Sequence, residues 1–245
     1  MSMRKDRLYC QIIDREFSLS KEDLHKITAV LRKRRGDKLF IFDGRGREYE
    51  VFIEDINKKN IVFSSPVLTG QADKPRINIT AAFSVIRPNK IDFLLQKCTE
   101  LGADIFLPFI SEYSNFSTIS SSKEEHYRKV IEESAAQCGR LWMPDLRECT
   151  DLSRLISGAS EYDIVLYAHP YTDNTVFYIE KLRNLKSGSV LLIIGPEGGF
   201  SAEESLKLES CSNVIPVKIS DFILRAETAA LFLTGLVRGV INRNL

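Results

Sequence analysis

The stretch IIGPEGGFSAEE, residues 193–204, joins an apolar segment to an acidic one through a turn with three glycines and a proline. Ser201 and Glu204 have the spacing of a capping box, so a helix is expected to begin directly after the turn. Glycine tolerates positive φ and the close approach of a ligand, while Pro196 restricts the entry to the turn. The glycines are Gly195, Gly198 and Gly199. The stretch therefore predicts a buried strand, a ligand-holding loop and a helix.

The charge of this loop bears on the kind of ligand that it holds. A glycine-rich turn before a helix is typical of phosphate sites, which normally add a Lys or Arg, whereas this turn has Glu197. A carboxylate suits a ligand with hydroxyls, amines or positive charge, such as a ribose or a sulfonium compound. A tight turn with Glu197 in solvent is the other interpretation at this point.

Strand patterns alternate with amphipathic helix patterns on both sides of this stretch. Strands are expected at 77–85, 104–110, 163–169, 189–195 and 213–219. Helices are expected at 89–102, 123–139, 175–185, 201–210 and 225–243. This alternation is typical of a parallel sheet covered on both faces, so the fold class is α/β.

Ligands of open parallel sheets bind beyond the carboxyl ends of the strands, because loops and helix amino termini meet there. The segments expected at this edge are YAHP after Leu166, GPEGGF after Ile194 and SDFILR after Ile219. We expect a binding site where these loops converge.

The first third of the chain has a different pattern. Extended segments are expected at 7–14, 37–56 and 60–68, with a hairpin turn at 43–46. A helix is expected at 20–34, with Ser20 and Asp23 at its amino end. The segment 69–75 has linker composition. The chain is therefore expected to divide into a small β-barrel-like domain, residues 1–72, and the α/β domain, residues 73–245.

Composition excludes several classes of protein. The chain has 245 residues, of which 44% are hydrophobic and 27% charged, as in ordinary globular proteins. Its five cysteines are scattered without a Cys-x-x-Cys pair and only three histidines accompany them, so we expect neither a disulfide framework nor a metal site. No long apolar run is present, and we expect a cytoplasmic protein with no membrane partner.

Basic residues are concentrated near the amino terminus. Residues 1–75 contain 16 Lys and Arg against 12 Asp and Glu, while the rest of the chain contains 18 against 21. A solvated face is one interpretation and a polyanion such as RNA is the other. The candidate RNA contacts are Arg4, Arg7, Arg32, Arg34, Arg45 and Arg47. Contacts of this kind make binding fall steeply with salt.

Arg225 stands where the last helix is expected to begin, and a cation there opposes the helix dipole. A salt bridge with Glu227 would explain its position, and so would a role in the site. The helix that follows carries more apolar surface than one core face requires, which suits either a buried helix or a subunit interface.

Four motifs together resemble one family. They are GPEGGFSAEE (195–204), ILRAETAA (223–230), LLQKCTELGADIFLPF (94–109) and EESAAQCGR (132–140), and LHKITAVLRKRRGDKLFIFDGRGREYE (24–50) matches in order. The family is RsmE, the 16S ribosomal RNA uracil-N3 methyltransferases of the SPOUT superfamily. The resemblance implies an N-terminal PUA-like β-barrel domain and a C-terminal SPOUT α/β domain with a deep trefoil knot. It also implies a homodimer that binds S-adenosylmethionine and methylates N3 of a uridine near the 3′ end of 16S rRNA in the small ribosomal subunit.

The resemblance assigns roles to individual residues. The expected cofactor contacts are Leu166 and Ala168, by position only, with Gly195, Pro196, Gly198, Gly199, Ile219, Ser220, Ile223 and Leu224. Arg225 is expected to stabilise charge on the uracil ring, and Glu197 either orients a ligand hydroxyl or accepts the proton. Ser220 and Phe222 replace the Gly and Arg that are common in the family, so this chain lacks the side chain of that Arg.

Two other functions remain compatible with the sequence. One is another SPOUT activity, such as methylation of the ribose 2′-hydroxyl, because the cofactor loops are shared across the superfamily. The other is an RNA-binding or ribosome-assembly module that keeps the fold without catalysis.

Overall fold

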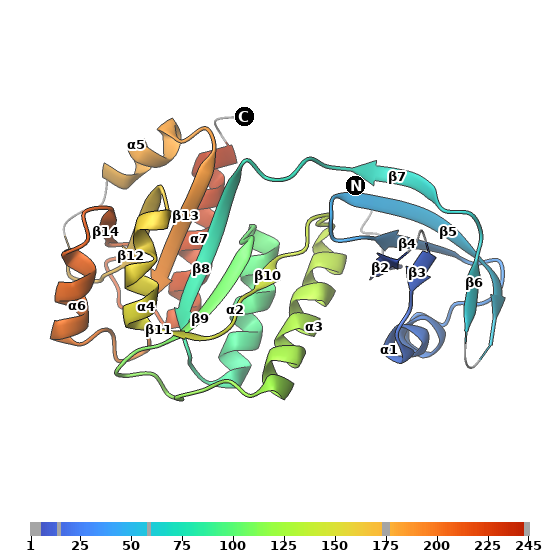
Figure 1. The fold of residues 1–245 in the computed structure, drawn as a ribbon, viewed down its shortest axis with the longest axis horizontal. Helices are drawn as coiled ribbons and strands as arrows, with labels where there is room; N and C mark the ends of the chain where they lie inside the picture. Colours follow the sequence, from blue (N-terminus) through green and yellow to red (C-terminus); the bar gives the residue numbers. More distant parts are fainter. Residues whose placement is uncertain (1–5, 14–15, 58–59, 173–176, 243–245) are drawn as a thin grey trace. The chain divides into compact units, whose positions relative to one another are not determined.

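The computed structural model describes residues 6–13, 16–57, 60–172 and 177–242. The chain forms two compact units (Figure 1). The N-terminal unit comprises Met1–Lys74 with Glu132–Met143, and the C-terminal unit comprises Pro75–Ile131 with Pro144–Leu245. Our linear division at residues 72 and 73 did not foresee that Glu132–Met143 packs with the first unit.

The N-terminal unit is built on a small β-sheet with the strand order β1-β4-β5-β6, and β7 also pairs with β5. These strands are β1 Arg7–Tyr9, β4 Lys38–Phe42, β5 Arg47–Ile56, β6 Ile61–Phe63 and β7 Val67–Gln71. A separate pair is formed by β2 Gln11–Ile13 and β3 Glu16–Ser18. The hairpin predicted at 43–46 is confirmed, because β4 and β5 pair antiparallel across it. The single extended segment predicted at 60–68 is two strands, β6 and β7.

The helix predicted at 20–34 is shorter than expected. The capping box of Ser20 and Asp23 is confirmed, and α1 spans Lys21–His25. A π-helical turn, Lys26–Val30, follows it. Within this wider turn Ile27 is buried, whereas Val30 is 65% exposed.

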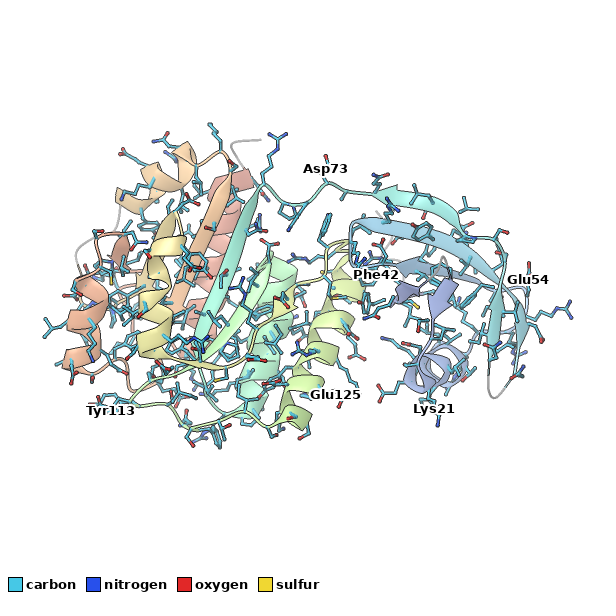
Figure 2. The ribbon with its side chains drawn as sticks, in the orientation of Figure 1. Lys21, Phe42, Glu54, Asp73, Tyr113 and Glu125 are labelled. Carbon is cyan, nitrogen blue, oxygen red and sulfur yellow. The ribbon has the colours of Figure 1, made fainter. Side chains whose placement is uncertain are left out.

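The segment Glu132–Met143 joins the N-terminal unit through apolar packing and backbone hydrogen bonds. It contains the last part of α3, Ser121–Cys138. Phe42 packs against Ala135 and Ala136, and Figure 2 shows Phe42 beside this part of α3. The N–H of Gly46 donates to the carbonyl of Leu141 at 3.0 Å.

The C-terminal unit is built on a parallel sheet of seven strands, as the alternation predicted. The strand order is β10-β9-β8-β13-β12-β14, and β11 also pairs with β9. The strands are β8 Ile77–Ser84, β9 Ile105–Ile110, β10 Asp145–Leu146, β11 Thr150–Asp151, β12 Ile164–Ala168, β13 Gly188–Ile194 and β14 Val214–Val217. The two shortest strands, β10 and β11, were not predicted, because two residues carry no periodic pattern.

Helices cover both faces of this sheet (Figure 1). On one face α7, Ala226–Asn242, packs on β8 and β13 and contacts α2, Pro88–Leu101, and α5, Phe177–Asn184. On the other face α4, Leu152–Ser157, contacts α6, Ala202–Glu209. A short 3-10 turn, Ala159–Glu161, follows α4. Among the described residues no helix has the length and apolarity that a membrane span requires.

The core under α4 and α6 places the functional edge of the sheet. Leu155 and Leu208 pack against Val165, Leu191 and Ile193. Burial of this apolar surface stabilises the unit and fixes the strand ends from which the next loops leave. The carboxyl ends of β12, β13 and β14 therefore lie together at one edge.

Candidate functional site

A cavity of about 290 Å³ lies at the carboxyl ends of β12, β13 and β14. Three loops line it, and they are those that the sequence analysis selected. The predicted cofactor residues in its lining are Ala168, Gly195, Pro196, Gly198, Gly199, Ile219, Ser220, Ile223 and Leu224. Glu197 is also in the lining. Leu166 is not, because its side chain is fully buried within β12.

The glycine-rich loop after β13 needs its glycines for different reasons. Gly199 has φ +74°, a backbone conformation that residues other than glycine rarely adopt. A Cβ on Gly195 would lie 2.8 Å from the ring of Phe200, and one on Gly198 would lie 3.2 Å from Cβ of Tyr113. Tyr113 lies in the loop after β9 (Figure 2). Of the three glycines, only Gly199 therefore uses a positive φ.

The far end of the same loop is anchored in the core. Phe200 stacks on Phe109 with ring centroids 6.2 Å apart and meets the edge of Tyr167 at 5.6 Å. The predicted capping box is confirmed, since Ser201 and Glu204 exchange both hydrogen bonds at the start of α6. Glu204 also accepts a hydrogen bond from the N–H of Glu112 at 2.8 Å. These contacts hold the carboxyl end of the loop in place.

Other lining residues were not named individually among the predicted cofactor contacts, although some of them lie in the three predicted segments. They are His169, Pro170, Tyr171, Ile194, Phe200, Ser205, Phe222, Ala226 and Ala229. His169 lies in the segment YAHP, which was expected at this edge of the sheet, although it was not named as a contact. Its Nδ1 accepts a hydrogen bond from the N–H of Tyr171 at 3.3 Å.

The rim of the cavity exposes large apolar side chains. Tyr171 and Phe222 are each 80% exposed, and Ile223 is 76% exposed. Ser220 closes its own loop, because its Oγ accepts a hydrogen bond from the N–H of Phe222 at 3.0 Å. These apolar groups gather where two loops meet the cavity.

Charged side chains surround Glu197. Lys90, on α2, forms an ion pair with Glu197, and its Nζ lies 3.8 Å from Oε1 of Glu227. The hydrogen bond from Lys90, with the positive charges of Lys90, Arg87 and Arg225, lowers the pKa of Glu197. Glu197 is therefore ionised at neutral pH.

Arg225 does not form the salt bridge with Glu227 that the sequence left possible. Within the described ranges, the ion pair of Glu227 is with Lys90, and Arg225 has none. The side chain of Arg225 is exposed. Its guanidinium group is therefore available to a ligand.

Five of the six predicted RNA contacts are either exposed or outside the described residues. Arg32, Arg34, Arg45 and Arg47 are exposed. Arg4 lies outside the described residues.

Arg7 is only 5% exposed, which corrects its predicted role. Its Nε donates to Glu48 at 2.5 Å, and its other nitrogens donate to the carbonyls of Ala135, Ala136 and Arg140. The guanidinium also lies over the ring of Phe42. Arg7 therefore holds Glu132–Met143 within the N-terminal unit, so it cannot also grip a phosphate.

No cluster of three or more His, Cys, Asp or Glu side chains suited to a metal ion occurs in the part of the chain that the structure describes. The cysteines are free. The burial of Cys10 and Cys98 raises the pKa of each thiol to about 12. These two thiols are therefore protonated packing groups.

Matches to known protein families show the family to which the chain belongs. Residues 73–238 match the RNA methyltransferase domain, and residues 19–64 match the RNA methyltransferase PUA domain. The chain belongs to the RsmE family of RNA methyltransferases. Its N-terminal unit is accordingly PUA-like, and its C-terminal unit is the methyltransferase domain.

Individual relatives agree with this membership over most of their length. The ribosomal RNA small subunit methyltransferase E of Rickettsia conorii is 29% identical over 89% of this chain and 87% of its own length. That of Buchnera aphidicola subsp. Schizaphis graminum is 30% identical over 94% of both. A methyltransferase structure from Legionella pneumophila, in complex with S-adenosylmethionine (SAM), has a TM-score of 0.86 to this structure and 27% sequence identity. The match covers 96% of this chain and 98% of that one.

Proposed function

We propose that this chain transfers a methyl group from SAM to N3 of a uridine near the 3′ end of 16S rRNA, within the small ribosomal subunit. The observation that carries the proposal is the cavity formed by three loops at one edge of the parallel sheet, with Glu197 in its lining. Family membership and the SAM complex of the Legionella relative support it. Such a substrate makes the cytoplasm the site of action.

The residues of the cavity fit SAM. Gly195, Gly198 and Gly199 line the cavity without side chains, so backbone is available to a ligand at the cavity wall. Ile194, Ile219 and Leu224 supply apolar lining for an adenine or a thioether chain. When bound, SAM supplies an electrophilic methyl group on a sulfonium centre. The ionised carboxylate of Glu197 suits the hydroxyls and the positive charge of such a ligand.

The base must present N3 as a nucleophile. The N3–H is weakly acidic, and loss of its proton spreads negative charge over O2 and O4 of the ring. In our proposal Arg225, which is exposed and has no ion pair among the described residues, stabilises this charge. Because N3 lies on the Watson–Crick edge, the uridine must be unpaired or extruded to react. Methyl transfer then forms the N3–carbon bond as the sulfur–carbon bond breaks, and the proton from N3 passes to solvent.

The N-terminal unit supplies the grip on RNA in this proposal. Arg32, Arg34, Arg45 and Arg47 are exposed cations on a PUA-like unit. Phosphate contacts of this type give affinity without sequence preference. We keep residues 1–72 as the RNA-gripping domain and residues 73–245 as the catalytic domain, with Glu132–Met143 packed in the first unit.

We also propose the family's homodimer and trefoil knot for this chain. The apolar side chains of Phe222, Ile223 and Phe232 are exposed beside or after the cofactor loops, on 219–225 and α7. Association of two copies through this surface would remove apolar area from water.

Reverse transcription of 16S rRNA tests the proposal directly. N3 methylation blocks base pairing, so wild-type RNA should stop the polymerase at one position near the 3′ end, and RNA from a strain lacking the gene should not. The wild-type gene should restore the stop, while the Arg225→Ala gene should not. Mass spectrometry of digested RNA that showed a methylated ribose would favour the other SPOUT activity. An unchanged stop and no SAM binding would favour a silent RNA-binding module.

A further inference from the structure

Lys90 and Glu227 lie beside the cavity and have no part in the function proposed above. Lys90 is in the first turn of α2, and Glu227 is in the first turn of α7. The Nζ of Lys90 is shared between Glu197, in the cavity lining, and Glu227, 3.8 Å away. One cation thus links a buried carboxylate to the carboxylate of the cofactor loop.

The position of Lys90 runs against local preference. The amino end of a helix disfavours cations, because its free N–H groups carry partial positive charge. Arg87, at the N-cap of α2, adds a second cation at the same end. The two carboxylates offset this repulsion, so Lys90 owes its position to contacts outside its own helix.

Glu227 is the fixed end of this arrangement. It is only 8% exposed, and the amino end of α7 favours its negative charge. Its Oε1 faces Lys90, while its Oε2 is buried and has no hydrogen-bond partner in the described structure. A buried carboxylate without a counter-charge is strongly unfavourable, so Glu227 anchors the ammonium group of Lys90.

Glu197 is the free end. Its side chain is 38% exposed and stands on a loop, so it has several rotamers available without a tether. We propose that Lys90, anchored by Glu227, is a positioning residue that holds the ionised carboxylate of Glu197 in the cavity wall. Glu197 then orients the ligand by accepting hydrogen bonds and is not the group that removes the N3 proton. The identity of that ligand rests on the function proposed above.

The electrostatics of the cluster support this role. The groups that face Glu197 are Lys90 and Arg87 from α2 and Arg225 from the loop before α7, with Glu227 behind Lys90. The hydrogen bond from Lys90 is the largest cause of the lowered pKa of Glu197. A carboxylate with a lowered pKa is a weaker base, which favours orientation over proton transfer.

The first test needs no methyl transfer. Glutamate labelled with ¹³C at the side-chain carboxyl lets NMR follow the titration of Glu197 in the full chain, with the signal assigned from Glu197→Gln. Lys90→Gln should raise the pKa of Glu197, and Lys90→Arg should leave it lowered. Lys97→Gln is the matched control, because it removes another α2 lysine that is paired with Glu100 at 2.7 Å. Equal titration of Glu197 in Lys90→Gln and wild type would overturn the proposal.

The second test separates positioning from general structure. Lys90→Gln should slow single-turnover methyl transfer about tenfold and move the acid limb of its pH profile upward, and Lys90→Arg should restore both. In the Glu197→Gln background, Lys90→Gln should cause no further loss, because the group that it positions is absent. Additive losses in rate would refute the proposal that Lys90 acts through Glu197. Circular dichroism of each variant checks that it folds. If wild type methylates no uridine, the proposed function fails while the NMR titration still decides the role of Lys90.

Discussion

Two loops line the same cavity in opposite ways. The loop after β13, residues 195–201, is bounded by a stacked Phe200 and by the capping box of α6. The loop after β14, residues 218–225, exposes Phe222 and Ile223, and the ion pair of its Lys218 with Asp221 is at the surface. The first loop is shaped by the fold, whereas the second leaves Phe222, Ile223 and Arg225 exposed. We therefore expect the first loop to be a preformed wall of the cavity and the second to become covered when a ligand or partner binds.

The comparison assigns different consequences to changes in the two loops. Changes in the β13 loop should alter stability and cofactor binding, because the shape of that loop depends on its own packing. Changes in the β14 loop should alter catalysis or association and leave stability almost unchanged.

The largest effect is expected from Arg225→Ala in the exposed loop. Removal of a charge that stabilises the reacting base costs about 10²–10³-fold in rate. Single-turnover methylation of small-subunit RNA should fall by that factor, while the affinity for SAM, measured by calorimetry, stays the same. Arg147→Ala is the matched control, since Arg147 is another exposed arginine, about 4.0 Å from Asp145. A rate within threefold of wild type would remove Arg225 from the mechanism.

The next effect compares one aromatic side chain from each loop. Phe200→Ala should lower the free energy of unfolding by about 2–3 kcal/mol, because it removes a half-buried ring that packs on Phe109 and Tyr167. Phe222→Ala should change it by less than about 0.5 kcal/mol, since that ring is 80% exposed. Urea denaturation of both variants gives the two values. Equal losses would contradict the distinction between a packed and an exposed loop.

The sequence predicted the C-terminal fold well, because the long strands and helices of that unit carry strong periodic patterns. It also located the cavity loops, since the glycine turn and the capping box are local signals. It did not foresee the ion pair of Lys90 with Glu197, because the two residues are 107 positions apart. The burial of Arg7 was missed for the same reason, since its partners include residues 41 and 128 positions away. An arginine in a sequence indicates a positive charge, but the sequence does not show whether that side chain is already paired within the folded protein.

A smaller effect is expected from Gly195→Ala in the packed loop. The new Cβ would lie 2.8 Å from the ring of Phe200, so the ring or the loop must shift at a cost of about 1–3 kcal/mol. The affinity for SAM should fall by roughly ten- to a hundredfold, because the loop that shifts is the cavity wall. Gly239→Ala on α7 is the control, since a Cβ there meets nothing within 4 Å. Unchanged SAM affinity in Gly195→Ala would show that the wall adapts.

The smallest expected effect is the pH dependence of SAM affinity, which depends on the charge of Glu197 in the β13 loop. The hydrogen bond from Lys90, together with Arg87 and Arg225, lowers the pKa of Glu197 in the folded protein. The ionised form and its contribution are therefore present above the ordinary glutamate range and are lost only as pH falls through the lowered pKa. SAM affinity should accordingly hold to a lower pH than an isolated glutamate would permit.

Salt should sharpen this result, because about 1 M salt reduces the Debye length to about 3 Å and weakens the half-exposed ion pair. The pH below which SAM affinity falls, the acid limb, should then move upward toward the ordinary glutamate range. Glu197→Gln should abolish the limb at both salt concentrations, which distinguishes Glu197 from acids elsewhere in the chain. A limb that stays in place in high salt would mean that the packed loop holds Glu197 by itself, without the cations that surround it.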